Sequence, residues 1–270
     1  ARPMGCIHVD FGEPVKLSEA PLPDDQIAIS KIAFQVAVEA NRVTPATFPA
    51  VVSASLLGAF PRALTEAEVI REVRDITHWA TKRGVRLSPD FNLNYTDKMP
   101  ELLGNMIDEG IIARFDGGLE TVYGIAEGQA SIASFYRNTI VHFFLHRAVA
   151  ELALLALSER TSEESAMDRF WEEVRELRDL FKFEFFYPET REFEEQIDQE
   201  LSREAPGWQE RLKDDTDNAR ILLNTLSPKV GHFTLTIFAE AYSIGADILL
   251  RFGEEPGFDE ETFISRCMSY

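Results

Sequence analysis

Histidine is the side chain best suited to proton transfer or metal binding near neutral pH, and the sequence contains five. His142 and His146 lie four residues apart, a spacing that can place two imidazoles on one helical face as metal ligands. The zinc-protease pattern also needs a glutamate directly after the first histidine, where this sequence has Phe143. Glu151 follows His146 by five positions, which turns the two side chains to different faces of a helix. We therefore predict neither a metal site nor a catalytic histidine–carboxylate pair here.

The other three histidines also lack partners for catalysis. His8 and Asp10 alternate along one short segment, which is more typical of a solvated strand face than of an oriented imidazole. His78 lies beside Trp79 in a predicted helix, and His232 precedes an apolar helix. The sequence contains no phosphate-binding glycine loop, no dinucleotide fingerprint and no nucleophile elbow. We expect no cofactor.

The charge balance narrows the classes of partner. The formal net charge is -19, from 46 acidic and 27 basic residues. Electrostatic binding to nucleic acid or to anionic lipid needs clustered Lys and Arg, so this composition argues against nucleic acid as a partner. The two cysteines, Cys6 and Cys267, have no ligand-like neighbours, which fits a reducing compartment. The most apolar stretch, residues 141–157, contains charged side chains and is predicted to be a core helix.

The elements that must position these residues are mainly helices. Residues 6–11 alternate with a period of two and precede Gly12-Glu13-Pro14, which predicts one strand and a turn. Residues 112–115 and 121–125 flank an Asp-Gly-Gly turn, which predicts a β-hairpin. Elsewhere the periodicity predicts helices, among them residues 26–41, 48–60, 66–83, 139–157, 166–186 and 233–252, with a last one beginning at Glu260. The predicted fold is therefore mainly α, with one N-terminal strand and one hairpin.

The helices follow a recurring order that predicts repeat-like units. An apolar helix, a polar turn and a capped amphipathic helix occur over units of about 45–130 and 131–225, and the order begins again over 226–270. Thr65 with Glu68 and Ser165 with Asp168 have the spacing of capping boxes, and Asp259 is a candidate cap for the last helix. The third unit stops early, which predicts an uncovered apolar surface.

Four segments, in order, resemble the C-terminal region of the bacterial membrane glycerol-3-phosphate acyltransferases. Residues 7–15 (IHVDFGEPV) resemble the strand and turn that close the acyltransferase domain of that family, and residues 32–65 resemble the helices that follow. Residues 134–142 (SFYRNTIVH) are similar to the family's aromatic-Tyr-Arg-Asn-x-x-x-His segment, and residues 181–185 sit where the family has a comparable helix end. The resemblance implies that residues 1–25 close an upstream α/β acyltransferase domain and that residues 26–270 form a C-terminal helical region.

The resemblance also implies an activity for the parent enzyme. Members of the family move a fatty acyl group from acyl-CoA or acyl carrier protein to the first hydroxyl of glycerol 3-phosphate, at the cytoplasmic face of the cell membrane. Their chemistry depends on a His-x4-Asp motif, and no histidine here is followed by an aspartate at that spacing. We therefore assign no catalytic residue to this chain and expect the catalytic motifs upstream of it.

Arg137, Asn138 and His142 match a segment of that family, and they are the candidate binding or interface residues. Helical spacing predicts that Asn138 and His142 share one face with Arg137 beside it, so that hydrogen bonds could tie this region to the upstream catalytic domain. We favour this interface role over contact with a ligand.

Two other classes of function stay open at the level of sequence. The chain could be an independent acidic helical-repeat scaffold that binds other proteins without catalysis. A helix that feeds a hairpin could also form a winged-helix regulator, but the hairpin carries one arginine, Arg114, against Asp116 and Glu120. This excess of negative charge on the hairpin disfavours binding to DNA.

Overall fold

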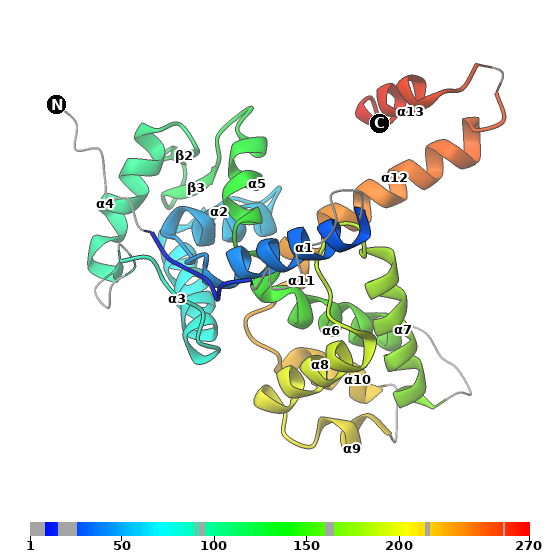
Figure 1. Ribbon diagram of the computed structural model, residues 1–270. Coiled ribbons are helices and arrows are strands. Elements are labelled where there is room, and N and C mark those ends of the chain that lie inside the picture. The colour runs from blue at the N-terminus through cyan, green and yellow to red at the C-terminus, as the bar shows by residue number, and fades with distance from the viewer. Residues whose placement is uncertain are drawn as a thin grey trace. The chain divides into compact units, whose positions relative to one another are not determined.

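A computed structural model describes residues 9–15, 26–89, 91, 95–159, 165–213, 217–255 and 257–270 (Figure 1). The chain forms two compact units, the first made of residues 1–143 with 182–188 and the second of residues 144–181 with 189–270. The boundary falls inside one helix, Val141–Glu159 (α6). Within the described ranges the fold is mainly α with a small antiparallel sheet, as the sequence predicts.

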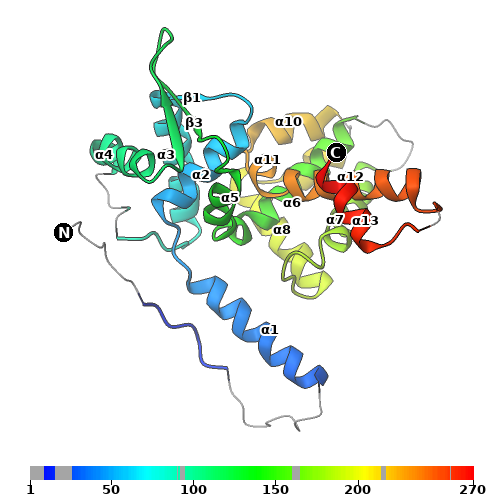
Figure 2. The same cartoon turned by 90° about the horizontal axis from the view of Figure 1, so that it is seen from above.

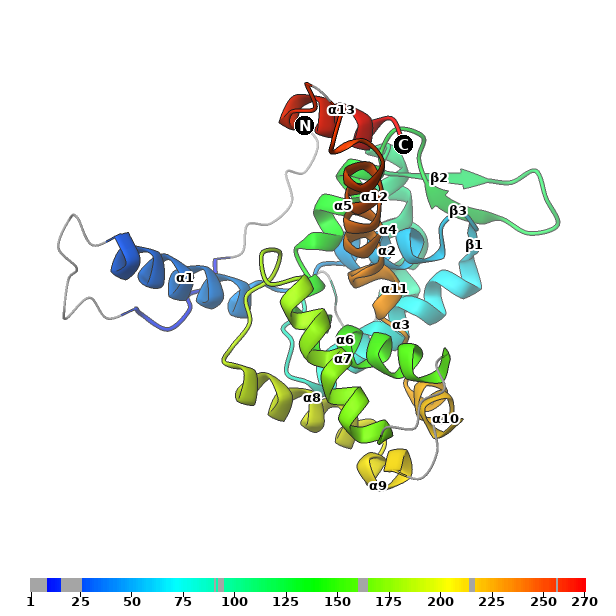
Figure 3. The same ribbon diagram turned by 90° about the vertical axis from the view of Figure 1, so that its right-hand side faces the viewer.

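The first unit combines several helices with a small three-stranded sheet. Its elements are α1 (Gln26–Val43), α2 (Phe48–Ala59), β1 (Leu64–Thr65), α3 (Glu66–Lys82), α4 (Tyr95–Asp108), β2 (Ile112–Phe115), β3 (Val122–Ile125) and α5 (Ala130–Asn138). The sheet order is β1-β3-β2, with Leu64 opposite Tyr123. In Figures 2 and 3, α1 lies apart from α2, α3 and α5, while the β2–β3 hairpin extends away from the helices. The hairpin is confirmed, whereas β1 is a strand that sequence reasoning missed because it is only two residues long.

The helix α3 begins where its predicted capping box lies. The Thr65 hydroxyl accepts a hydrogen bond from the Glu68 amide at 3.3 Å, and the Glu68 carboxylate accepts one from the Thr65 amide at 2.9 Å. Val69, Val73 and Ile76 then recur at helical spacing and are buried. The local sequence thus sets both the start of α3 and the face that it buries.

The predicted opening strand is not present where the structure describes the segment. Cys6, Ile7 and His8 lie outside the described residues, and residues 9–15 form no strand. A lone strand needs a partner for its backbone groups, and here the segment is held instead by ion pairing of Asp10 with Arg86 and by the Glu13 amide, which donates to the Glu39 carboxylate at 3.0 Å. The pairing of this strand with an upstream domain stays a prediction.

The second unit is built on α6 and on seven later helices. They are α7 (Ala166–Leu180), α8 (Thr190–Glu204), α9 (Trp208–Lys213), α10 (Asp217–Thr225), α11 (Gly231–Thr234), α12 (Thr236–Phe252) and α13 (Glu260–Met268). Phe170, Phe193 and Trp208 are fully buried in its core. By length and composition α6 alone, among the described helices, is apolar enough to cross a membrane, and 61% of its most apolar stretch is buried inside the protein.

Three local predictions for the second unit are wrong. Ser165 precedes α7, but its side chain makes no capping hydrogen bond, so the second capping box with Asp168 does not form. The helix ends at Leu180 and not at residue 186, because residues 182–188 leave this unit for the first one, where Phe186 meets Phe34 at 4.8 Å between ring centroids. The helix predicted over residues 233–252 is two helices, α11 and α12, which part at Leu235.

Candidate functional site

Arg137 lies in the last turn of α5 and is an internal residue of the first unit. The residue is only 4% exposed. Its guanidinium donates two hydrogen bonds to the Asn138 side-chain oxygen, from Nη2 at 2.8 Å and from Nε at 3.2 Å. Burial lowers the pKa of Arg137 from its usual value. In the part of the chain that the structure describes, no carboxylate pairs with this guanidinium. The arrangement suits a structural tie better than a site that exchanges ligands.

His142 lies in the first turn of α6 and ties that helix to the end of α1. Its Nε2 is 2.9 Å from the carbonyl oxygen of Asn41, to which the neutral ring donates a hydrogen bond. Desolvation lowers the pKa of His142 below 6.5, and the bond to Asn41 opposes this shift only in part. An imidazole whose Nε2 proton is already committed to a backbone carbonyl is not poised as a general base.

The structure does not bring the three candidate residues onto one helical face. The helix α5 ends at Asn138 and α6 begins at Val141, so the prediction that Asn138 and His142 share one helical face is wrong. The amides of Thr139 and Ile140 turn back to carbonyls three residues earlier, and the Thr139 hydroxyl also bonds to the Tyr136 carbonyl at 2.7 Å. Arg137 is consequently buried, Asn138 exposed and His142 partly buried. Of the three, Asn138 is the side chain best placed to reach another surface.

The pH dependence of stability tests the tie at His142. In the unfolded chain this imidazole takes up a proton near pH 6.5, whereas in the native unit it does so only at lower pH. Between those two values the unfolded state binds more protons, so the free energy of unfolding should fall as the pH falls through this window. Glutamine keeps an N–H donor but does not titrate. In His142→Gln the free energy of unfolding should therefore fall less steeply with falling pH, by up to about 1.4 kcal/mol per pH unit.

Chemical denaturation of the first unit between pH 5 and 7.5 measures this effect. His78→Gln, a change at an exposed histidine of the same unit, is the matched control. Equal pH slopes for the wild type and His142→Gln would contradict the assignment of His142 as a buried neutral tie.

Sequence reasoning missed a buried charged cluster, which lies in the second unit. Arg147 is fully buried on α6; its Nε donates to Glu151 at 3.0 Å, and its Nη1 donates to Glu200 on α8 at 3.4 Å. The Glu151 carboxylate also accepts the backbone amides of Val230 and Gly231 at 2.9 and 2.8 Å. The signal was available, since Arg147 and Glu151 are four residues apart within an apolar helix.

This cluster ties three parts of the second unit together. Burial raises the pKa of Glu151, while the amide of Gly231 and the Arg147 guanidinium oppose that rise. The Arg147 Nη2 also donates to the Pro228 carbonyl at 3.4 Å, so one guanidinium joins α6, α8 and the segment before α11. The groups that Arg147 and Glu151 contact all belong to the second unit, and the cluster is therefore a structural network.

The other histidines do not form a reactive site with these residues. His146 is half-buried and packs against Phe193, at 5.1 Å between ring centroids. Burial lowers the pKa of His146. Among the described residues, no three His, Cys, Asp or Glu side chains gather as metal ligands. The side chains of His8 and His232 lie outside the described residues.

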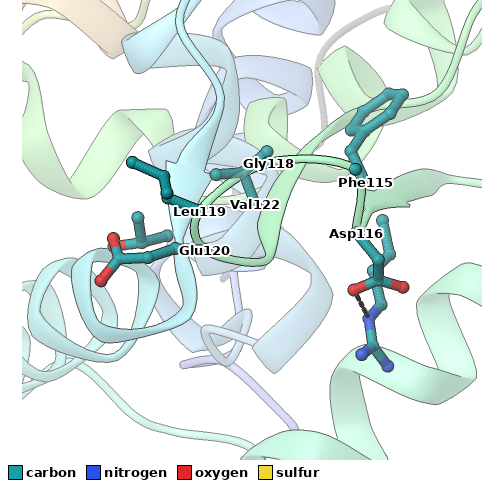
Figure 4. Close-up of a pocket in the computed structure, with 9 residues that line it drawn as sticks. Phe115, Asp116, Gly118, Leu119, Glu120 and Val122 are labelled. Atoms are coloured by element: carbon teal, nitrogen blue, oxygen red, sulfur yellow. Dashed lines mark hydrogen bonds and ion pairs between the residues drawn. The ribbon is translucent and has the colours of Figure 1, made fainter.

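A surface hollow with a volume of about 930 Å³ lies at the tip of the β2–β3 hairpin (Figure 4). The Asp116 carboxylate there accepts bonds from the Arg114 guanidinium at 2.9 Å and from the Thr121 hydroxyl at 2.8 Å, and both donors lower its pKa. Figure 4 shows Leu119 and Glu120 on the opposite side of the loop from Asp116. The hollow holds no base, nucleophile or oxyanion donor arranged for a reaction.

The family model described as "Glycerol-3-phosphate acyltransferase C-terminal region" matches residues 1–270. The chain belongs to this family. Proteins named "Putative acyltransferase plsB1" from Mycobacterium tuberculosis and Mycobacterium bovis are 35% identical to it over 272 aligned residues. The alignment covers 98% of this glycerol-3-phosphate acyltransferase C-terminal region but only 44% of each relative.

Proposed function

We propose that this chain is the helical support of a glycerol-3-phosphate 1-O-acyltransferase whose catalytic domain lies earlier in the same polypeptide. The parent enzyme would transfer a fatty acyl group from acyl-CoA or acyl carrier protein to glycerol 3-phosphate, giving lysophosphatidate. The supporting observation is that the family match spans all 270 residues, while none of the five histidines has an aspartate at the His-x4-Asp spacing.

The supporting role follows from how the polar residues of this chain are used. Arg137 and His142 bond to neighbours within the first unit, and Arg147 and Glu151 bond to neighbours within the second. Side chains committed in this way hold helices in place and are not free to act as the acid or base of acyl transfer. The parent would act as a peripheral protein at the cytoplasmic face of the cell membrane.

The proposed domain division follows the same assignment. Residues 1–25 would complete the upstream acyltransferase domain, and residues 26–270 would form the helical region with units of about 45–130, 131–225 and 226–270. The exposed Asn138, next to the buried Arg137, would contact the catalytic domain together with the His142 turn. The nearby Phe135 is 68% exposed on the same helix and would add apolar area to such a contact.

The Arg137→Ala variant of the full-length enzyme tests this role. Removing a buried arginine takes away both its packing and its bond to Asn138, so the variant should lose about 1–3 kcal/mol of stability. The KM for glycerol 3-phosphate should stay within about twofold, because the residue does not contact substrate in this proposal. Thermal melting and steady-state kinetics on the same preparation measure both quantities.

Arg114→Ala provides a control within the same unit, because Arg114 is half exposed and pairs with Asp116 on the hairpin. Its melting temperature should stay close to that of the wild type. A large rise in KM for glycerol 3-phosphate with unchanged melting in Arg137→Ala would instead place Arg137 in a substrate site.

A further inference from the structure

The last two helices form a preassembled hairpin. Phe263 of α13 packs over Gly245 of α12, with its Cζ 3.5 Å from where a Cβ would lie. The Arg266 guanidinium stacks on the Phe252 ring at 4.0 Å and pairs with Glu255 at 2.8 Å. Figure 1 shows α13 turned back beside α12. The hairpin therefore has a defined shape.

The outward side of this hairpin is apolar and uncovered by the described residues. Leu250 is 87% exposed and Met268 is 84% exposed, and Leu249 and Ile264 are each about half exposed. Ile264 and Met268 lie four residues apart and share one face of α13. In α12 only Ile248 is buried, and in α13 no residue is. A hairpin with large apolar side chains held outward in a fixed geometry has the character of an interaction surface.

The charges around this surface indicate which partner fits it. Residues 236–270 contain seven acidic and two basic side chains, a net charge of -5. Both basic side chains are paired inside the hairpin, Arg251 with Asp247 and Arg266 with Glu255, each at 2.8 Å. The unbalanced acids include Glu254, Glu260 and Glu261, which are exposed. The apolar surface thus has an acidic rim.

An acidic rim disfavours two of the possible occupants. A membrane with anionic headgroups repels it, since helices that lie on such membranes carry Lys and Arg on their polar face. A second copy of the hairpin would bring two acidic rims together. The partner that fits is a protein surface with an apolar centre and a basic rim. The matched relatives extend well beyond the 44% of their length that this chain covers, so such a surface can be present in the same polypeptide at high effective concentration.

We propose that the apolar face of the α12–α13 hairpin docks on a basic-rimmed apolar surface of the acyltransferase part of the same polypeptide. This inference rests on the proposed function and adds a second contact to the one at Asn138. It assigns the exposed leucines of α12 and the Ile264–Met268 face of α13 to the centre of the contact. Glu260 and Glu261 are assigned to its rim.

Cysteine labelling in the full-length enzyme tests the docking. Leu250→Cys is compared with Leu119→Cys, a leucine that is fully exposed at the tip of the β2–β3 hairpin. Labelling with N-ethylmaleimide, followed site by site by mass spectrometry, should be at least tenfold slower at position 250 at every protein concentration. Adding Glu260→Lys and Glu261→Lys together should remove that protection. Deuterium exchange of α13 in the wild type gives a second readout that does not depend on the Leu250 change.

Each other outcome overturns the proposal. Equal labelling of the two cysteines, with fast exchange of α13, means that the face is uncovered. Protection that appears only as the enzyme self-associates assigns the face to a second copy, and protection that needs phosphatidylglycerol vesicles assigns it to a membrane. If position 250 stays protected from labelling in the variant that also carries Glu260→Lys and Glu261→Lys, the partner surface has no basic rim and the proposal is wrong. Acyl transfer is measured on the same samples to separate the docking proposal from the proposed function. An enzyme that turns over glycerol 3-phosphate while position 250 is labelled freely rejects the docking and leaves the proposed function standing.

Discussion

Replacing Glu151 by alanine is expected to lower the free energy of unfolding of the second unit by about 3–5 kcal/mol. Glu151 is 5% exposed, pairs with the fully buried Arg147 and accepts two backbone amides before and at the start of α11. Truncation leaves a buried guanidinium short of one carboxylate and two buried amides without an acceptor, and each of these losses costs stability. Denaturation followed by circular dichroism, in the transition that contains this unit, measures the change.

The chain offers a matched pair that isolates the effect of burial. Arg191 and Glu195 have the same i,i+4 spacing and the same 3.0 Å distance, but their side chains are 91% and 58% exposed. Glu195→Ala should change the free energy of unfolding by no more than about 0.5 kcal/mol. Glu151→Gln keeps one carbonyl acceptor, so its loss in free energy of unfolding should lie between those of Glu151→Ala and Glu195→Ala. A loss in Glu151→Ala no larger than in Glu195→Ala would show that the buried network contributes nothing.

A double replacement separates the pair from its surroundings. Changing Arg147 to methionine and Glu151 to leucine removes both charges and fills their volume with apolar atoms. The double variant should be more stable than Glu151→Ala, because no buried guanidinium is left short of a carboxylate, while Glu200 keeps its ion pair with Arg203. Its remaining deficit reports the amides of Val230 and Gly231, which lose their acceptor in both variants, together with Glu200 and the Pro228 carbonyl, which lose the Arg147 guanidinium.

The second large effect is expected in catalysis. The isolated 270-residue chain, supplied with acyl-CoA and glycerol 3-phosphate, should form no lysophosphatidate above the buffer blank. Acyl transfer needs a base within hydrogen-bond reach of the substrate hydroxyl, and proton transfer alone contributes about 10²–10⁴-fold to such rates. His142 donates to the Asn41 carbonyl and His146 is packed against Phe193, so neither is placed for this task.

The full-length enzyme in the same buffer is the positive control for this assay. Its His142→Gln variant should keep its kcat within about threefold, since that imidazole is assigned to a structural bond. Release of lysophosphatidate by the isolated chain, detected by mass spectrometry, would mean that an active site lies within these residues. The proposal would then be wrong.

Those features of the fold that depend on near neighbours could be read from the sequence. The capping box of Thr65 and Glu68, the Asp259 cap of α13 and the hairpin around Asp116 are all confirmed. Each is decided within a few residues, by hydrogen bonds or turn geometry that the residue types themselves specify. The family resemblance is also a property of the sequence, because it needs only the order and identity of residues, and the family match confirms it.

Similar local patterns failed where distant contacts decide the outcome. Ser165 and Asp168 have the same spacing as Thr65 and Glu68, yet no capping bond forms at Ser165. The aromatic segment that begins at residue 181 is split between the two units, with Phe181 in the second and residues 182–188 in the first. Phe181 is buried, whereas Phe183 is exposed. A spacing rule states which bond is possible, and the packing around it determines whether that bond forms.

The candidate site shows the same division between sequence and tertiary structure. The sequence singled out Arg137, Asn138 and His142, but only the folded chain separates them by the turn at Thr139 and assigns His142 to a carbonyl about one hundred residues earlier. The partners of Arg147 and Glu151 on α8 and before α11 lie 53 and 79 residues away in the chain. Local preferences fix helices and turns because the groups involved are already close, whereas burial and long-range pairing exist only once the chain has packed.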